Sequence, residues 1–98
     1  MTGTRQQQIV DILNEVAEAH HMVYKITEGD HPDWASWYAD QMINRSYLPD
    51  VLASVPVPSE LVYLLVLCDK EYTAMENPSE SWQEYYGRRI LEHFAPEN

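Results

Sequence analysis

Trp34-Ala35-Ser36-Trp37-Tyr38-Ala39 recurs in this chain as Trp82-Gln83-Glu84-Tyr85-Tyr86-Gly87, 48 residues later. Aromatic rings match at three offsets, and the small residue that ends each copy lets a neighbouring helix approach closely. A repeat of this length is typical of one supersecondary unit used twice, each copy burying its apolar face against the other. The motif therefore indicates an architecture, and it contains no catalytic signature.

Helix signals surround the first copy of the motif. Thr4 and Gln7 form a capping box ahead of apolar residues with helical spacing, which predicts a helix over about 5–28. Pro32 suits the first turn of a second helix, which we expect over about 32–45. These two helices make up the first half of the predicted repeat.

The second half begins after a Pro-Val-Pro breaker. We expect an irregular connection over 46–58, with one helical turn at Leu48–Ala53. A helix should follow over about 59–76. Ser79 is the expected N-cap of the last helix, which should end near residue 94.

The expected fold is all-α, a single domain over 1–98. Short turns favour antiparallel neighbours, so 5–45 and 59–94 should form two tandem helical hairpins. Together they would make a four-helix, bundle-like arrangement with pseudo-twofold symmetry. The run Leu61–Leu67 has the composition of a buried strand, but we reject that alternative because helical spacing continues to Tyr72.

Charge and composition restrict the partners. The 98 residues carry a net charge of −10, distributed over both halves of the chain. Such a surface repels nucleic acid and anionic membranes, whereas it attracts cations and basic proteins; simple solubility is the alternative explanation. The longest apolar run, Leu61–Cys68, is far shorter than the ~20 residues that span a bilayer. With one cysteine and a polar N-terminus, we expect a cytoplasmic protein with no membrane contact.

The aromatic motif supplies the main candidates for binding a partner or ligand. On each predicted short helix its three rings share one face. One interpretation is that these rings form the hairpin core, and the other is that they line a groove. The chain has three Trp and seven Tyr but one Phe, and rings with a polar group suit half-exposed sites. The candidates are Trp34, Trp37, Tyr38, Trp82, Tyr85 and Tyr86.

The predicted helix over 59–76 is apolar on more than one side. One stripe, suited to the core, consists of Leu61, Leu64, Leu65, Cys68 and Tyr72. Other apolar side chains lie off this stripe and need a second cover. We expect a homodimer to provide it, unless the helix over 32–45 or the segment 48–55 does so. The interface candidates are Val62, Tyr63, Val66 and Leu67.

Catalytic and metal signatures are weak. His20 and Cys68 occupy equivalent places in the two halves and are the only metal candidates; a buried histidine and a buried apolar cysteine are the alternative. We predict no catalytic residue and no cofactor. Acidic residues are expected on solvated faces, and Arg88 and Arg89 in ion pairs within their own helix.

Two functional hypotheses follow from these patterns. The first is a non-enzymatic, acidic interaction module that docks on a basic protein through grooves lined by rings. The second is a small-molecule or metal-binding protein, with enzymatic activity left open. Its pocket would lie between the hairpins, lined by Trp34, Tyr38, Trp82, Tyr86, His20 and Cys68. Mimicry of nucleic acid by the acidic surface is a third, weaker hypothesis.

Overall fold

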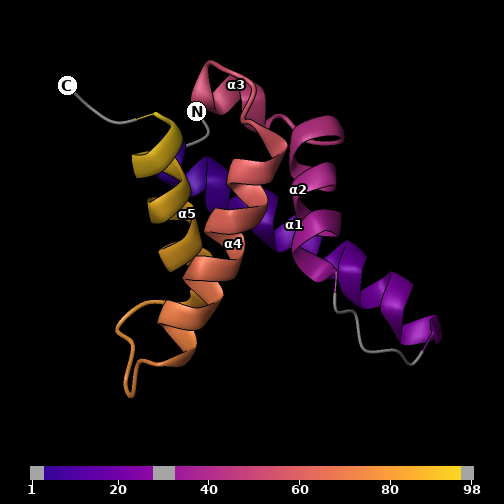
Figure 1. The fold of residues 1–98 in the computed structure, drawn as a ribbon, viewed down its shortest axis with the longest axis vertical. Helices are drawn as coiled ribbons and strands as arrows, with labels where there is room; N and C mark the ends of the chain where they lie inside the picture. The colour runs from indigo at the N-terminus through magenta and orange to yellow at the C-terminus, as the bar shows by residue number, and fades with distance from the viewer. Residues whose placement is uncertain (1–3, 28–32, 96–98) are drawn as a thin grey trace.

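The computed structural model describes residues 4–27 and 33–95, with the side chains of 23–27 left out. These residues form five helices, which pack together compactly, and no strand occurs among them (Figure 1). The helices are α1 (Arg5–Thr27), α2 (Trp34–Asn44), α3 (Leu48–Leu52), α4 (Pro58–Thr73) and α5 (Trp82–Phe94). The all-helical prediction is confirmed, and none of the helices in the described part of the chain is long and apolar enough to cross a membrane.

Local sequence explains where the helices begin. The Gln7 amide donates to the Thr4 hydroxyl at 3.0 Å, as the predicted cap requires. Pro58 stands at the start of α4, where its missing N–H costs nothing, and Val57 before it is extended. The start signal predicted at Pro32 lies outside the described residues.

α3 confirms the short helical turn expected over Leu48–Ala53 in the connection. Pro49 starts it, and Ala53 ends it in the left-handed conformation, with φ of 61°. Its three buried residues, Leu48, Val51 and Leu52, add to the core. The connection is therefore a fifth packed helix, because its apolar side chains are buried against α1 and α2.

The core lies among all five helices. The largest side chains that are fully buried are Ile9, Ile12, Leu13, Met42, Leu48, Leu61, Leu65, Cys68 and Ile90. The predicted stripe on α4 is confirmed, since Leu61, Leu64, Leu65 and Cys68 are its buried residues. α1 is buried mainly in its first half, and Figure 1 shows its second half extending outward from the packed helices.

The most extensive helix contacts join the two halves of the chain. α1 packs chiefly against α5, and α2 packs chiefly against α4. α2 and α5 both begin at the end of the molecule opposite α3, where α4 ends (Figure 1). The first turns of two helices therefore meet the last turns of a third at one place.

Candidate ligand pocket

A cavity of about 300 Å³ lies where α1, α2, α4 and α5 meet. Six of the seven residues around it carry aromatic or imidazole rings, and the seventh carries a carboxylate. The lining residues are His20, Trp34, Tyr38, Asp69, Tyr72, Trp82 and Tyr86. Among the described residues, the cavity therefore combines a wall of rings with one acidic group.

Two Trp–Tyr pairs, one on α2 and one on α5, belong to this wall. Trp34 and Tyr38 are in edge-to-face contact, with ring centroids 5.6 Å apart and planes at 87°. Trp82 and Tyr86 have the same kind of contact, at 5.0 Å and 69°. Each Trp is the first residue of its helix, so its Tyr partner stands one turn further along. Both Tyr side chains are buried and both Trp side chains are half-buried, which leaves the indoles nearer to solvent.

Two Tyr hydroxyl groups around the cavity, those of Tyr38 and Tyr86, have raised pKa values. Burial raises the pKa of Tyr86, and the nearby Asp69 carboxylate raises it further. The Tyr86 hydroxyl donates to Asp69 Oδ1 at 3.3 Å. Burial also raises the pKa of Tyr38. The Tyr72 hydroxyl donates to the Glu80 carbonyl at 2.8 Å and so fixes the segment between α4 and α5 at the edge of the cavity.

The structure brings together most of the residues of the pocket hypothesis. Trp34, Tyr38, Trp82, Tyr86 and His20 all line the cavity. The His20 ring lies 5.2 Å from Trp37 and 5.3 Å from Tyr38, between centroids. Cys68 is 0% exposed and is not part of the lining, and burial raises its pKa to about 11.

Two of the predicted aromatic candidates lie elsewhere. Trp37 packs on Tyr38 and His20 outside the lining. The Tyr85 hydroxyl points to the other side of α4 and donates to Glu71 Oε1 at 2.7 Å. The third ring of each copy of the motif therefore serves packing or polar contacts rather than the cavity.

Sequence reasoning missed Asp69 as a site residue and named Tyr72 only as a core residue. Both line the cavity from the last turns of α4. Asp69 directly follows Cys68, one position beyond the buried stripe, and Tyr72 lies three residues later. Their spacing places them on one helix face, which is the signal that was available.

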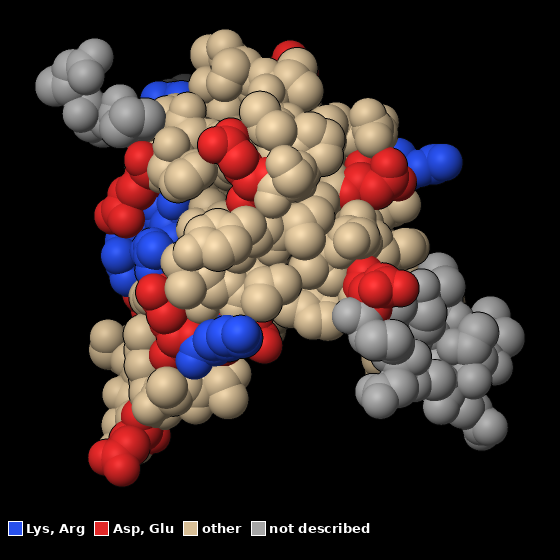
Figure 2. All heavy atoms as spheres, in the orientation of Figure 1, with Lys and Arg blue, Asp and Glu red and all other residues tan. Residues whose placement is uncertain are grey.

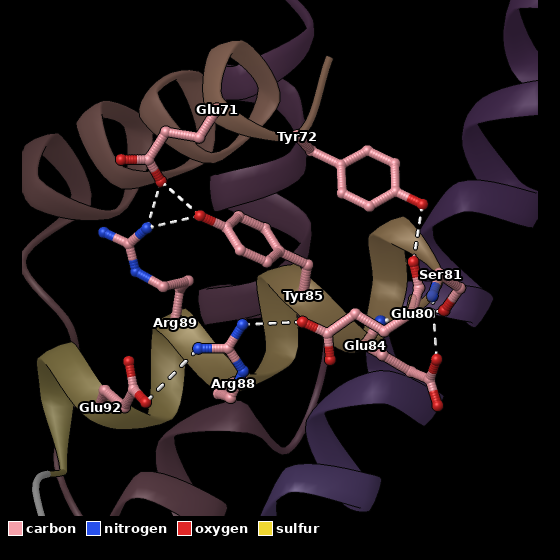
Figure 3. Close-up of polar contacts among 9 residues, drawn as sticks. All are labelled: Glu71, Tyr72, Glu80, Ser81, Glu84, Tyr85, Arg88, Arg89 and Glu92. Atoms are coloured by element: carbon pink, nitrogen blue, oxygen red, sulfur yellow. Dashed lines mark hydrogen bonds and ion pairs between the residues drawn. The ribbon is translucent and has the colours of Figure 1, made fainter. Parts of the chain in front are cut away.

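A cluster of polar side chains connects α5 to α4 and to the segment between them (Figure 3). Arg89 forms an ion pair with Glu71 on α4 and donates to the Tyr85 hydroxyl at 2.9 Å. Arg88 pairs with Glu80 at 2.7 Å and more distantly with Glu92 at 3.7 Å. The prediction of pairs within one helix was therefore wrong for Arg89 and only partly right for Arg88.

The start of α5 also differs from the prediction. Ser81, and not Ser79, is the N-cap. The Glu84 amide donates to the Ser81 hydroxyl at 3.1 Å, and the Ser81 amide donates to Glu84 Oε1 at 2.9 Å. This reciprocal capping box uses the Ser-x-x-Glu spacing, which Ser79 lacks.

The predicted interface residues on α4 are covered to different extents. Val62 and Val66 are partly buried against the core, and Leu67 is also partly buried. Tyr63 is 65% exposed. Across the part of the chain that the structure describes, no group of three or more His, Cys, Asp or Glu side chains is arranged to hold a metal ion.

Comparisons of the chain with family models, with curated proteins and with solved structures find no match.

Proposed function

We propose that this chain is a non-enzymatic binding protein whose aromatic cavity takes a small organic group. The observation that carries the proposal is the convergence of six rings from four helices on one cavity. Ligand sites are typically concave, mostly apolar and equipped with a few polar groups that fix orientation. A volume of about 300 Å³ is at the small end of this class, which suits a compact ligand or a single side chain.

A binding role fits these residues better than catalysis does. A nucleophilic cysteine needs an accessible thiolate, whereas burial raises the pKa of Cys68 to about 11. Tyr38 and Tyr86 likewise keep their protons, because burial raises the pKa of both. Cys68, Tyr38 and Tyr86 are thus poorly suited to proton transfer near pH 7, and the two Tyr side chains are suited to contact and hydrogen bonding.

We further propose that the sequence repeat is also a structural repeat. A pseudo-twofold axis would relate α1 and α2 to α4 and α5, giving the four-helix arrangement, with α3 as an addition. In support, Trp34 and Trp82 are each the first residue of their helix and make the same kind of contact with a Tyr one turn later. The packing of α1 on α5 also corresponds to that of α4 on α2.

Saturation-transfer NMR with a library of small organic fragments tests the binding proposal. We expect fragments that bind the full chain but not the Trp34→Leu or Trp82→Leu variants. Tyr63→Leu is the control, because Tyr63 is exposed and does not line the cavity. Circular dichroism establishes that each variant keeps its helices. If no fragment binds, or if the hits bind the Trp variants equally well, the proposal is wrong.

A second candidate function is protein interaction through an apolar surface beside α4. Val55, Val57 and Tyr63 are 69%, 51% and 65% exposed, which is high for large apolar side chains so close in sequence. We propose that this surface joins two copies of the chain in a homodimer, and that the acidic surface recruits a basic protein. Figure 2 shows Asp and Glu at several separate places on one face rather than in a single cluster.

Sedimentation equilibrium tests the homodimer. The molar mass should rise from one chain toward two with concentration, and Tyr63→Glu should shift this transition to higher concentration. Glu60→Gln, in the same helix, is the control for a change of charge. A single-chain mass at every concentration would exclude the homodimer.

The free Cys68 thiol suits a reducing compartment, and we propose the cytoplasm as the location.

A further inference from the structure

We infer that the cavity binds an organic cation whose head is a methylated ammonium group, held by the aromatic rings and by Asp69. The inference rests on the proposed binding function and names the chemistry of its ligand. A cation over an aromatic face is attracted by the ring quadrupole, and Trp rings attract it best. Two Trp and three Tyr surround this cavity, which is the ring composition that quaternary ammonium groups favour.

The charges around the cavity select for a cation. Asp69 is exposed at the edge and supplies a carboxylate, and its Oδ1 is held by the Tyr86 hydroxyl. None of the described residues that line the cavity is Lys or Arg. The nearest arginines of α5 are paired with Glu71 and Glu80. An anion would meet Asp69 without a compensating positive charge, on a chain whose net charge is −10.

Helix ends could oppose a cation here, because α2 and α5 point their positive N-termini toward the cavity. Each of these ends carries an acid beside it: Asp33 occupies the N-cap position of α2, and Glu84 lies in the first turn of α5. α4 contributes its C-terminal turns, where the helix dipole is negative. Among the described residues, Asp69 therefore determines that the charge at the cavity is negative.

Methylation distinguishes the proposed ligand from a free amine. A primary ammonium brings three N–H donors, each of which needs an acceptor when it leaves water. Among the described lining residues, Asp69 is the one carboxylate and already accepts from the Tyr86 hydroxyl, while the two indole N–H groups can only donate. A quaternary ammonium has no N–H group to satisfy and is weakly hydrated, so the rings suffice. This group occurs on free choline-like molecules and on trimethylated lysine.

Isothermal titration of the full chain at pH 8 and constant ionic strength tests the inference. The probes are choline and its neutral isostere 3,3-dimethylbutan-1-ol, which has the same shape without the charge. We expect choline to bind about tenfold more tightly than the isostere. Asp69→Asn should weaken choline about fivefold and leave the isostere unchanged, because it removes the charge and keeps an acceptor for Tyr86.

Asp50→Asn is the control for the loss of one negative charge, since Asp50 lies on α3 at the opposite end of the molecule (Figure 1). Titrations with a trimethyl-lysine peptide and with its unmodified form distinguish the source of the group. If the methylated peptide binds more tightly than choline, the methylated ammonium group belongs to a protein partner. If choline binds more tightly, the group belongs to a free molecule.

The failures of the two proposals are distinguishable. If the isostere binds as tightly as choline, or if Asp69→Asn leaves choline binding unchanged, the cation inference is wrong and the binding function stands. If neither probe nor peptide binds, the cation inference is also wrong. The fragment screen then decides the binding function independently.

Discussion

Ser81 caps the start of α5 together with Glu84, three residues later. Its hydroxyl and its amide exchange hydrogen bonds with Glu84, so two otherwise unpaired groups at the start of α5 are satisfied. We predict that Ser81→Ala lowers the free energy of unfolding by about 1 kcal/mol. Urea denaturation measures the change. Ser79→Ala is the control and should change stability by less than about 0.5 kcal/mol. Equal effects of the two substitutions would contradict the assignment of the cap.

Glu71 links the stability of the chain to pH. The Tyr85 hydroxyl bond, assisted by Arg89, holds the pKa of this carboxyl below its ordinary value of 4.5. A carboxyl with a lowered folded-state pKa stabilises the fold above its unfolded pKa, and that contribution is lost as pH falls through the folded pKa. The contribution of Glu71 should therefore be complete near pH 7 and should disappear progressively below about pH 4.5.

Comparing wild type with Glu71→Gln isolates this contribution from all other acids. We predict that the variant is less stable at pH 7 and that the difference shrinks as pH falls below 4.5. Thermal unfolding at a series of pH values measures it. Glu92→Gln is the control, because Glu92 contacts Arg88 only at 3.7 Å and is largely exposed. A wild-type advantage that stays constant down to pH 3 would contradict the prediction.

At the scale of the helices, Gly87 shows how closely α5 approaches α1. A Cβ added at Gly87 would lie 3.1 Å from Val10 Cγ2 and 3.6 Å from the Gln6 carbonyl oxygen. Val10 is buried and β-branched, so its side chain has little freedom to move away. The expectation that a small residue here admits a neighbouring helix is confirmed.

Two effects oppose each other in Gly87→Ala. Alanine favours the helix by about 1 kcal/mol, while its methyl group presses on Val10. In the Val10→Ala background, we predict that Gly87→Ala raises the free energy of unfolding by about 1 kcal/mol. In wild type the increase should be smaller by about 0.5 kcal/mol or more, because the Val10 side chain is present. Urea denaturation of the four proteins in this double-mutant cycle measures the coupling. Equal effects of Gly87→Ala in both backgrounds would contradict the contact.

Helix existence could be predicted from sequence because it depends on local spacing. The Thr4 cap, the proline at 58 and the apolar stripe of α4 each act within a few residues. The helical turn of α3 was also expected, but a five-residue pattern does not show that its side chains join the core. Its stability comes from burial of Leu48, Val51 and Leu52, which is a tertiary effect.

At the scale of the whole molecule, the cavity could be predicted in part. The repeat indicated that Trp34 and Trp82 are equivalent, and a common axis would bring equivalent residues together. The spacing of Asp69 and Tyr72 places them on one face of α4, but an exposed acid does not show which other helices that face meets, so Asp69 was missed. The partners of Arg89 were missed for the same reason, since Glu71 lies on another helix.

The net charge of −10 gives a prediction about the molecule as a whole. Like charges repel more in the compact state than in the unfolded chain, so screening should stabilise the fold. We predict that the unfolding temperature rises as NaCl increases from low concentration, with most of the rise below about 0.15 M, where the Debye length has fallen to about 8 Å. The exposed ion pairs of Arg88 oppose this effect only weakly.

A variant with fewer acids separates this repulsion from general salt effects. Glu18 and Glu76 are exposed, and replacing both by Gln reduces the net charge without altering an ion pair described for this chain. We expect the variant to show a shallower rise in unfolding temperature than wild type over the same NaCl range, because less repulsion remains to be screened. Parallel curves for the two proteins, or a rise that continues linearly to high salt, would instead assign the effect to the action of salt on apolar hydration.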